Sequence, residues 1–434
     1  MKFQLSNTLG LQIFQVIRVS SLFLISILLV KSSVPIKEIG FYEVTLFLSN
    51  ILSFFWISGL IQAFLPMYRS NSNEHEKNSD LYNVFLVICG LSILLGFFGF
   101  VLQTSIQKIE GVSDLPFYHL VIIYTLISSP TSLIEYIYIL KNKPYHTVCY
   151  GGISYFIQIL LVVLPLLMGA GIEVSIYGLI AISAIRFVWL VFLVLDNSSQ
   201  TIQFDFIKRY LIIGIPLSFK YLISSSGTFI DGLIVSSKYN ASAFAIFRYG
   251  AKDLPLVNLL ANSLSNSMLP NFADKTKVHD TLKQIKAKSY KMMLWLFPFT
   301  ILLIFVCKPM YPWIFSKNFS ESANIFLIYL LLITSRLVFP QTIVLGFRKT
   351  GVILLVSIIE LLLNVGLSLI LVNWIGLEGV ALATVLVFLF EKVILIIYSY
   401  KKLQIKPSDY IPIKAYFTFS TITISSYLIA RFIF

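Results

Sequence analysis

The sequence predicts an all-α membrane protein that crosses the bilayer many times. Of its 434 residues, 57% are hydrophobic and only 12% are charged, whereas an average soluble domain is about half apolar and a quarter charged. Long apolar runs recur from residue 11 to residue 434 with short interruptions. A soluble globule of this length could not bury so much apolar surface, so the composition excludes soluble proteins.

Thirteen segments are long and apolar enough to be membrane spans, because a helix needs about 20 such residues to cross the hydrocarbon core. The spans are predicted at residues 11–30, 41–65, 81–102, 116–140, 148–168, 174–195, 210–236, 241–269, 292–306, 322–347, 351–372, 376–398 and 411–430. The longest hydrophilic stretch is 271–291, where the lysine spacing predicts an amphipathic cytoplasmic helix. This helix is expected to join two halves of a bundle or to lie on anionic headgroups.

The distribution of positive charge predicts the orientation of the chain. The formal net charge is +13, from 33 Lys and Arg against 20 Asp and Glu. With the N-terminus in the cytoplasm, 18 cations fall in cytoplasmic loops and seven on the opposite side. Lys and Arg are retained on the cytoplasmic side, so much of the charge is a topology signal and indicates no nucleic-acid partner.

An internal repeat predicts two halves. PTSLIEYIYILKNK (130–143) precedes an apolar span and then Gly178, and PQTIVLGFRKT (340–350) precedes an apolar span and then Gly379. The sequence therefore predicts two six-helix lobes, 1–200 and 201–400, with an additional transmembrane helix in 401–434. Duplicated halves around a central site are a transporter design in which one half moves against the other.

Eight cations lie inside the apolar segments. Lys392 and Lys414 are near cytoplasmic helix ends and are expected to snorkel to the interface. The other six are too deep for this: Arg18, Arg186, Lys220, Arg248, Lys252 and Arg336. A charge near the bilayer centre costs at least about 2.5 to 3.5 kcal/mol, so these residues imply ion pairs or a wet interior.

The acids at comparable depth are too few to neutralise these cations. Arg248 and Lys252 are spaced i, i+4, which predicts a shared helical face, and the adjacent Asp253 could neutralise one of them. Arg186 and Arg336 could each form a salt bridge between helices. The remaining cations would line a cavity that attracts phosphate or carboxylate, which the Arg fork matches well. Arg18, Lys220, Arg248 and Lys252 are the predicted substrate-binding residues, with Arg186 and Arg336 as further cavity cations.

Three acids are candidates for ion coupling or charge balance, namely Asp231, Asp253 and Glu360. Glu360 could instead be a protonated structural residue or the partner of Arg336. Neither a nucleophile nor a metal-ligand constellation surrounds the four histidines, and the sequence has no nucleotide-binding loop. The sequence therefore predicts no enzyme activity, no cofactor and no metal site.

Three segments resemble the polysaccharide flippases of the multidrug, oligosaccharidyl-lipid and polysaccharide exporter superfamily. Residues 364–388 resemble their penultimate helix pair, with the closest match in the G-x-x-G-x-A-x-A-T run. That run comprises Gly376, Gly379, Ala381, Ala383 and Thr384. Residues 35–60 resemble their first loop and second helix, and 231–270 resemble the counterpart in the second half.

This resemblance implies a Wzx-like flippase of the bacterial inner membrane. Such proteins move a polyprenyl-pyrophosphate-linked O-antigen, capsule or exopolysaccharide repeat unit to the outer leaflet by alternating access. Partners would be the lipid-linked glycan, membrane lipids and glycan assembly proteins. The family's V-shaped cavity is lined chiefly by spans 1, 2, 7 and 8, where Arg18, Lys220, Arg248 and Lys252 fall.

Departures from related branches bear on the alternatives. The drug-exporting branch is expected to carry a coupling acid in its first span, whereas residues 11–30 contain Arg18 and no acid. The lipid II flippase branch usually has fourteen spans. A lipid II-type flippase, an ion-coupled multidrug exporter and, from another class, a membrane glycan polymerase or ligase stay open as alternatives. The last would be expected to have a large outer loop, and the outer loops here are short.

Overall fold

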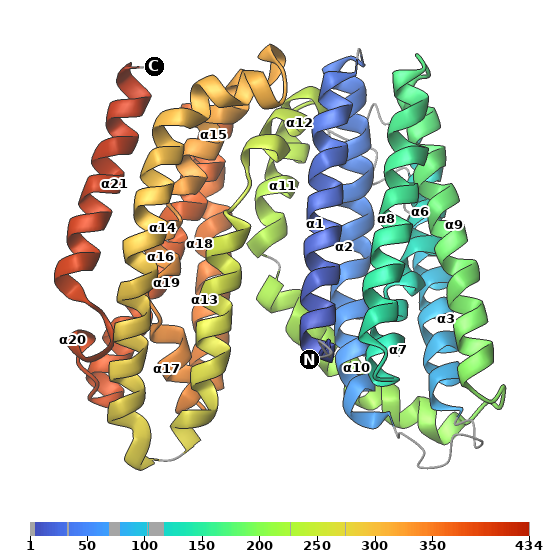
Figure 1. Ribbon diagram of the computed structural model, residues 1–434, viewed down its shortest axis with the longest axis horizontal. Coiled ribbons are helices and arrows are strands. Elements are labelled where there is room, and N and C mark those ends of the chain that lie inside the picture. The colour runs from blue at the N-terminus through green and yellow to red at the C-terminus, as the bar shows by residue number, and fades with distance from the viewer. Residues whose placement is uncertain are drawn as a thin grey trace. The chain divides into compact units, whose positions relative to one another are not determined.

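The computed structural model describes residues 5–32, 34–68, 79–101, 103, 117–225, 227–273 and 275–433. All regular structure in these residues is helical (Figure 1), which confirms the predicted all-α class. The chain divides into two compact units. Unit 1 comprises Met1–Ser225 and Ser236–Ala245, and unit 2 comprises Ser226–Val235 and Ile246–Phe434.

Unit 1 is a bundle of mostly long helices. They are α1 (Asn7–Lys31), α2 (Ile36–Met67), α3 (Asp80–Val101), α6 (Tyr118–Thr131), α7 (Leu133–Leu140), α8 (Pro144–Leu167), α9 (Ile172–Asn197) and α10 (Phe204–Ser225). Aromatic rings fix α1 against α8, since Phe14 stacks on Tyr150 with ring centroids 6.0 Å apart. The edge of Trp189 from α9 then meets Tyr150 at 5.3 Å. These rings hold three helices together around the polar interior of unit 1.

The predicted seventh span, 210–236, corresponds to α10 and α11 (Gly227–Lys238), which are described on either side of residue 226. Helix α10 packs tightly on α2 within unit 1, where a Cβ on Gly59 would lie 2.4 Å from the backbone of Ser218. The Tyr210 hydroxyl donates to the Leu60 carbonyl at 3.1 Å. The Gly59 contact therefore lets two backbones approach closely.

Unit 2 contains helices that are interrupted more often. They are α12 (Ala241–Gly250), α13 (Pro255–Met268), α14 (Val278–Ile314), α15 (Ser320–Leu330), α16 (Ile333–Arg336), α17 (Pro340–Gly346), α18 (Thr350–Ile375), α19 (Leu377–Leu403), α20 (Pro407–Tyr410) and α21 (Ile413–Ile433), with α12 beginning in unit 1. Short 3-10 turns lie at Leu269–Ala273, Lys275–Lys277 and Lys317–Phe319. Within the stretch predicted as a helix at 271–291, α14 begins at Val278 and then continues without a break through the predicted ninth span.

Two predicted spans of unit 2 are broken near prolines. The span predicted at 241–269 is interrupted between α12 and α13, because residues 251–254 are not helical and Pro255 begins α13. The span predicted at 322–347 is divided among α15, α16 and α17, and its two parts are bent by 45°. Proline lacks an amide hydrogen and disfavours helical geometry in the residue before it, so Pro255 and Pro340 are suited to the starts of α13 and α17. Proline alone does not dictate a break, because α14 contains three prolines within one helix.

The two glycines that the predicted repeat pairs, Gly178 and Gly379, each make a close helix contact. A Cβ on Gly178 of α9 would lie 2.2 Å from the Leu161 carbonyl oxygen of α8. A Cβ on Gly379 of α19 would lie 2.3 Å from the Leu371 carbonyl oxygen of α18. Only glycine fits where a backbone carbonyl is this close, so the helix after each proline-containing segment is tied to its neighbour in the same way.

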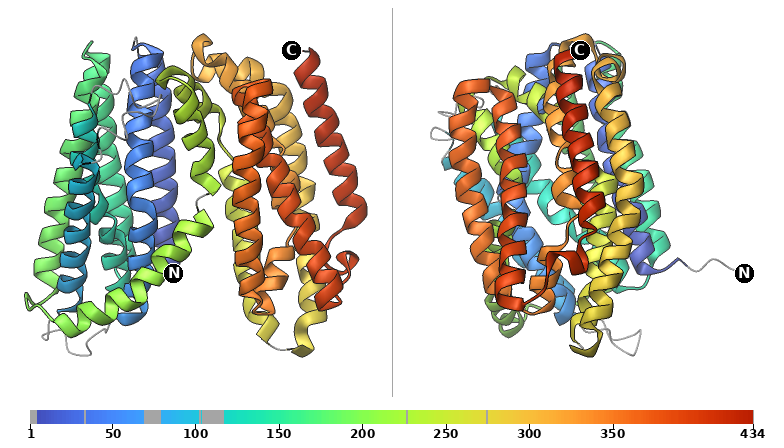
Figure 2. Two further views of the ribbon diagram at one scale, coloured as in Figure 1. Left: turned by 180° about the vertical axis from the view of Figure 1, so that it is seen from behind. Right: turned by 90° about the vertical axis from the view of Figure 1, so that its left-hand side faces the viewer.

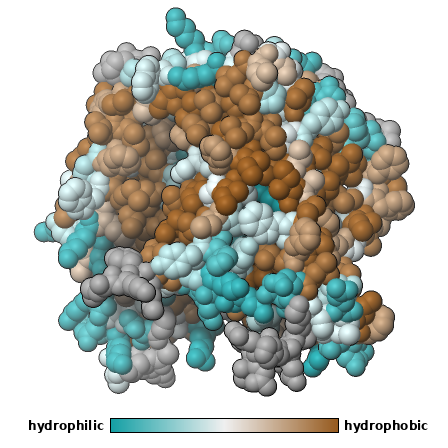
Figure 3. All heavy atoms as spheres, turned by 45° about the vertical axis from the view of Figure 1, so that its right-hand side comes forward, coloured by the Kyte–Doolittle hydropathy of each residue, from teal (hydrophilic) through white to brown (hydrophobic). Residues whose placement is uncertain are grey.

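Nine helices in the described residues are long and apolar enough to cross a membrane, or ten if the bent pair is one span. The other three predicted spans correspond to α10 with α11, α12 with α13, and α21, which do not meet both criteria. On the face drawn in Figure 3, hydrophobic residues cover a broad middle band and hydrophilic residues gather towards one end. The chain is a multi-pass membrane protein.

Candidate functional site

A polar cavity of about 300 Å³ lies among the helices of unit 1, here named the unit 1 chamber. Its charged side chains are Arg18 from α1, Glu135 from α7 and Arg186 from α9. Most of the remaining wall is made of hydroxyl, amide and aromatic groups: Ser49, Asn50, Ser53, Ser58, Tyr124, Ser128, Ser129, Thr131, Ser132, Tyr150 and Tyr155. The chamber therefore combines two guanidinium groups with hydrogen-bonding walls.

Arg186 is held in place by neutral groups. Its Nη2 donates to Gln158 Oε1 at 2.8 Å and to the Ser154 carbonyl at 3.3 Å. The guanidinium carbon lies 4.6 Å from the centre of the Tyr155 ring, a cation–π contact. Its buried Nε has no hydrogen-bond partner among the described residues. The arginine is thus fixed in position while one buried donor is unused, which costs about 1 to 3 kcal/mol.

Arg18 is half-buried in the same chamber. Within the part of the chain that the structure describes, no carboxylate forms an ion pair with Arg18 or with Arg186. Glu135 is buried with 6% of its surface exposed and is the chamber's one acidic side chain among the described residues. Two guanidinium groups against one carboxylate leave the chamber with an excess of positive charge, which attracts an anion.

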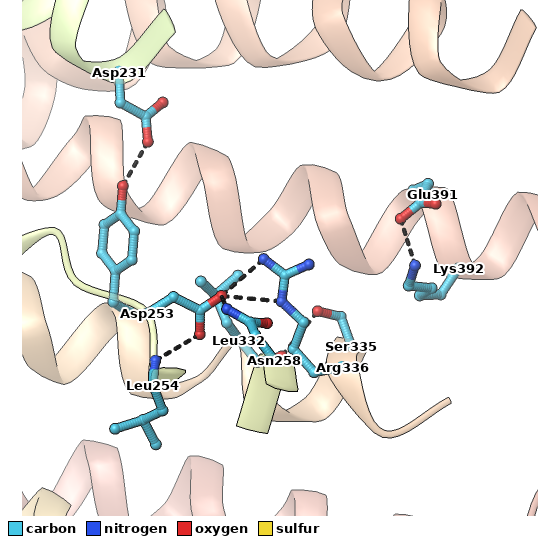
Figure 4. Close-up of polar contacts among 10 residues, drawn as sticks. Asp231, Asp253, Leu254, Asn258, Leu332, Ser335, Arg336, Glu391 and Lys392 are labelled. Carbon is cyan, nitrogen blue, oxygen red and sulfur yellow. Dashed lines mark hydrogen bonds and ion pairs between the residues drawn. The ribbon is translucent and has the colours of Figure 1, made fainter. Parts of the chain in front are cut away.

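A second polar cavity of about 300 Å³ lies inside unit 2, here named the unit 2 chamber. It is lined by Arg336 and Lys392 and by the polar side chains Asn258, Asn262, Ser265, Ser335, Gln341 and Thr342. Its two cations are paired (Figure 4). Arg336 donates to Asp253 Oδ2 through Nε at 3.0 Å and Nη2 at 2.8 Å, and Lys392 pairs with Glu391 at 2.7 Å.

These pairs decide several predictions about charge. The hypothesis that Arg336 forms a salt bridge is confirmed, with Asp253 as its partner. The expectation that Asp253 could neutralise Arg248 or Lys252 is wrong, because Asp253 pairs with Arg336 of α16 instead. Its carboxylate also accepts from Leu254 N and Asn258 Nδ2. The expectation that Lys392 snorkels is also wrong, since its side chain is only 12% exposed and pairs with Glu391.

Arg248 and Lys252 do not share a helical face, contrary to prediction. Helix α12 ends at Gly250, so Arg248 lies in its last turn while Lys252 lies in the non-helical segment 251–254. The Tyr311 hydroxyl donates to the Tyr249 carbonyl at 2.9 Å and fixes the end of α12. The Lys252 ammonium lies 5.1 Å from the centre of the Tyr249 ring. Lys220 lies on α10, and its side chain is outside the described part of the structure.

Asp231 of α11 is the centre of a buried hydrogen-bonded network in unit 2. Its carboxylate accepts from the Tyr329 hydroxyl at 2.6 Å (Figure 4) and from Thr384 Oγ1 at 2.7 Å. Asn364 Nδ2 donates to Thr384 Oγ1 at 3.3 Å, and the Ser368 hydroxyl donates to Asn364 Oδ1 at 3.0 Å. The network joins α11, α15, α18 and α19 through oxygen-rich groups, whereas Glu360 lies half-buried on α18.

Sequence reasoning missed the neutral half of the unit 1 chamber. Ser49, Asn50 and Ser53 interrupt the apolar second span, and Gln158 and Ser154 interrupt the fifth. Polar residues within a membrane span are rare unless they face a bundle interior or a cavity. Their clustering was a usable signal, but only the fold shows that the α2 residues line the same cavity as Arg18 and that the α8 residues hold Arg186 there.

The fold resembles those of solved transporters. The structure of "Lipid II flippase MurJ, inward closed conformation" matches with a TM-score of 0.70 at 18% identity, covering 98% of this chain and 98% of that one. An inward-facing multidrug resistance MATE family transporter of the MOP superfamily matches with a TM-score of 0.62 at 14% identity, covering 89% and 94%. At these identities the likeness shows the fold, which is that of the predicted superfamily.

Sequence comparison supplies the family. No curated protein matches the chain significantly, but a family model described as "Polysaccharide biosynthesis protein" matches residues 35–324. That match spans more than half of the 434 residues. The family and the structural neighbours are flippases and transporters, not enzymes, as the sequence predicts. The chain therefore belongs to the polysaccharide biosynthesis protein family and has the fold shared by MurJ and MATE transporters.

Proposed function

We propose that the protein is a flippase of the bacterial inner membrane that moves a polyprenyl-diphosphate-linked oligosaccharide from the cytoplasmic to the outer leaflet. The cargo would be a repeat unit of O-antigen, capsule or exopolysaccharide. The observation that carries this proposal is the unit 1 chamber, where Arg18 and Arg186 have no carboxylate ion-pair partner among the described residues. The family match supports a role in polysaccharide synthesis.

The chemistry of the chamber suits a glycosyl diphosphate. Guanidinium groups bind phosphate oxygens through paired N–H donors, and the side chains of Arg18 and Arg186 both line the chamber. The serine, threonine and asparagine side chains of the chamber wall can hydrogen-bond sugar hydroxyls. We therefore place the diphosphate on Arg18, with Arg186 assisting, and the first sugars against the hydroxyl-rich wall.

Arg248 and Lys252, together with Lys220 from α10, would be further binding residues, as the sequence predicts. The end of α12 is fixed by hydrogen bonds from α14 and α15, including Ser322 Oγ to the Ile246 carbonyl at 2.7 Å. This fixation orients Arg248 on a rigid support, which a binding site requires. The polyprenyl chain would stay in the lipid while the lobes predicted at 1–200 and 201–400 alternate between inward and outward access.

For the coupling ion, the geometry favours Asp231 among the three candidate acids. Asp253 is occupied by Arg336, whereas the Asp231 carboxylate is buried and surrounded by hydroxyl groups and the amide of Asn364. Oxygen ligands suit a proton or a hard monovalent cation. Its partners come from four helices, so binding or release of a cation there would change the packing of unit 2 and could bias alternating access.

The excess of positive charge separates this proposal from a cationic-drug exporter. A drug cation would be repelled by Arg18 and Arg186, whereas a diphosphate gains charge-assisted hydrogen bonds to both. A membrane glycan polymerase would need catalytic acid and base groups. Among the described side chains, the chamber has one carboxylate, Glu135, beside its two arginines. The charge balance thus supports transport of an anionic lipid headgroup.

The test is surface-glycan export in cells that lack the chromosomal copy. Arg18→Ala is expected to abolish export while the protein stays inserted at normal abundance, and Arg18→Lys should restore part of it. Lys401→Ala removes an exposed cation at the end of α19 and is the matched control. Full export by Arg18→Ala would contradict the proposed docking role.

A further inference from the structure

A groove of about 650 Å³ lies on unit 2 between α14 and α21. The two helices run side by side (Figures 1 and 2), and the α20–α21 turn closes one end of the groove. Its walls include Lys286, Tyr290 and Leu294 from α14, and Lys414, Thr418 and Phe419 from α21. None of these side chains belongs to the unit 1 or unit 2 chamber, so the groove is a separate site.

Charge and hydrophobicity are segregated along this groove. Lys286 lies in the hydrophilic part of α14, and the long apolar part of that helix begins after Lys291. Lys414 lies in the first turn of α21. Leu294 and Phe419 lie one or two turns further along the same helices, in the apolar part. Both helices therefore pass from a cationic end to an apolar wall in the same direction.

No acidic side chain among the described residues of the groove neutralises the two lysines at its cationic end. Lys286 Nζ donates to the Ser408 carbonyl at 2.7 Å, which holds the ammonium at the groove while its charge has a neutral partner. Asp409 is the acid nearest to Lys414 in the sequence. Its carboxylate accepts from the backbone N of Lys406 at 3.1 Å, at the start of α20. Lys414 is exposed. Two ammonium groups thus face the groove without an acidic side chain among its described lining residues.

We propose that this groove binds one anionic glycerophospholipid of the phosphatidylglycerol type. Its phosphodiester would lie between Lys286 and Lys414, and one acyl chain would lie along Tyr290, Leu294 and Phe419. Basic pockets between membrane helices on the cytoplasmic side attract anionic headgroups, worth about 1 kcal/mol per cation near the surface. A zwitterionic headgroup would bring an ammonium group towards the two lysines and gain less.

A lipid held here would tie α21 to α14. Helix α21 begins directly after the turn at Ile411 and Pro412, and Ser408 in that turn is bonded to Lys286. The bound lipid would fill the groove between these two helices. The site does not depend on the identity of the cargo, so it can be tested apart from the flippase proposal.

The test is retention of lipid by the full-length protein in nanodiscs made from equal parts of phosphatidylglycerol and phosphatidylethanolamine, measured by native mass spectrometry. The wild type is expected to retain one phosphatidylglycerol with at least tenfold preference. Lys414→Ala, which removes only an exposed ammonium, and Lys286→Ala/Lys414→Ala should lower that preference by about three- to tenfold. Lys401→Ala/Lys402→Ala, which removes two exposed cations outside the groove, is the matched control and should not change it.

Leu294→Trp provides an independent variant that keeps both lysines and fills the apolar wall, and it should also lower retention. Lys286→Arg/Lys414→Arg should keep the preference. Equal retention by wild type and Lys286→Ala/Lys414→Ala, or equal retention of the two phospholipids by the wild type, would overturn the proposal. Displacement of the bound lipid by polyprenyl phosphate at equal concentration would also overturn it, because the groove would then serve the cargo.

Discussion

The unit 1 and unit 2 chambers have similar volumes and polar walls with two cations each, but the cations are paired with carboxylates only in unit 2. In unit 2, Arg336 and Lys392 each have a carboxylate partner within 2.8 Å. In unit 1, no carboxylate pairs with Arg18 or Arg186 among the described residues, although Glu135 is buried in the same cavity. The two chambers therefore differ in whether their cations have charge left to bind an anion.

The difference teaches how to interpret a buried cation in a membrane protein. A cation paired with an acid has already recovered much of its desolvation cost, so its role is structural. A cation held by neutral groups, as Arg186 is held by Gln158 and Tyr155, retains a net charge to offer a ligand. Removing the first kind should reduce stability, and removing the second kind should reduce transport. Each prediction below applies this contrast.

The largest expected effect is on transport by Arg18→Ala. Loss of a guanidinium–diphosphate contact removes about 1.5 to 3 kcal/mol of charge-assisted hydrogen bonding, so the flipping rate at low substrate should fall roughly 10- to 100-fold. A reconstituted proteoliposome assay with a fluorescent polyprenyl-diphosphate glycan measures this. The thermal stability of the purified variant should match that of the wild type, and a large loss of stability would place Arg18 with the structural cations.

Arg336→Ala is expected to show the reverse pattern. It leaves Asp253 without its partner, and we expect destabilisation of roughly 2 to 3 kcal/mol, below the 3 to 5 typical of a fully buried pair. The lower value follows from the partial exposure of the two side chains, 24% and 20%. A thermal-shift assay in detergent measures it. Arg336→Met/Asp253→Asn should recover part of the stability, and unchanged stability in the single variant would break the contrast.

Substitution of the glycines at the close helix contacts should reduce stability by similar amounts in the two units, whereas substitution of the arginines should not. Gly178→Leu and Gly379→Leu each place a Cβ within 2.3 Å of a backbone carbonyl oxygen, so each should cost roughly 2 kcal/mol or more through overpacking. Gly366→Leu on α18 is the control, because a Cβ there meets nothing within 4 Å. Abundance in the membrane and melting temperature are the measurements, and a normal melting temperature in either variant would rule out that close approach.

The smallest expected effect is the change in substrate affinity caused by Tyr155→Leu. This substitution removes the ring under Arg186, a cation–π contact worth about 1 kcal/mol, and should weaken substrate binding roughly fivefold by loosening the guanidinium. Tyr155→Phe keeps the ring and should bind normally. A larger loss in Tyr155→Phe than in Tyr155→Leu would show that the hydroxyl, rather than the ring, matters to the cargo.

Much of the fold could be predicted from the sequence, because apolar run lengths directly reflect the bilayer thickness. The helical class and the approximate limits of most spans follow from local signals. The break at 251–254 is flanked by Gly250 and Pro255, a signal that hydropathy windows conceal. Since a hydropathy window averages over about 19 residues, two half-helices look like one span.

The partners of the buried charges could not be predicted, because each depends on helices far apart in the chain. Asp253 is adjacent in sequence to Lys252, yet its carboxylate bonds Arg336, 83 residues away. Likewise, Asp231 meets Thr384 across 153 residues. The spacing i, i+4 of Arg248 and Lys252 implies a shared face only in an unbroken helix, and α12 ends between them.

Equilibrium binding of a polyprenyl-diphosphate-linked oligosaccharide to the purified protein tests the central claim most directly. The wild type and Arg336→Met/Asp253→Asn, which leaves the unit 1 chamber intact, should bind with similar affinity. Arg18→Ala should bind at least tenfold more weakly, and removal of the diphosphate from the ligand should abolish that difference. Equal affinity of the wild type and Arg18→Ala for the diphosphate-bearing ligand would contradict the assignment of the unit 1 chamber as the headgroup site.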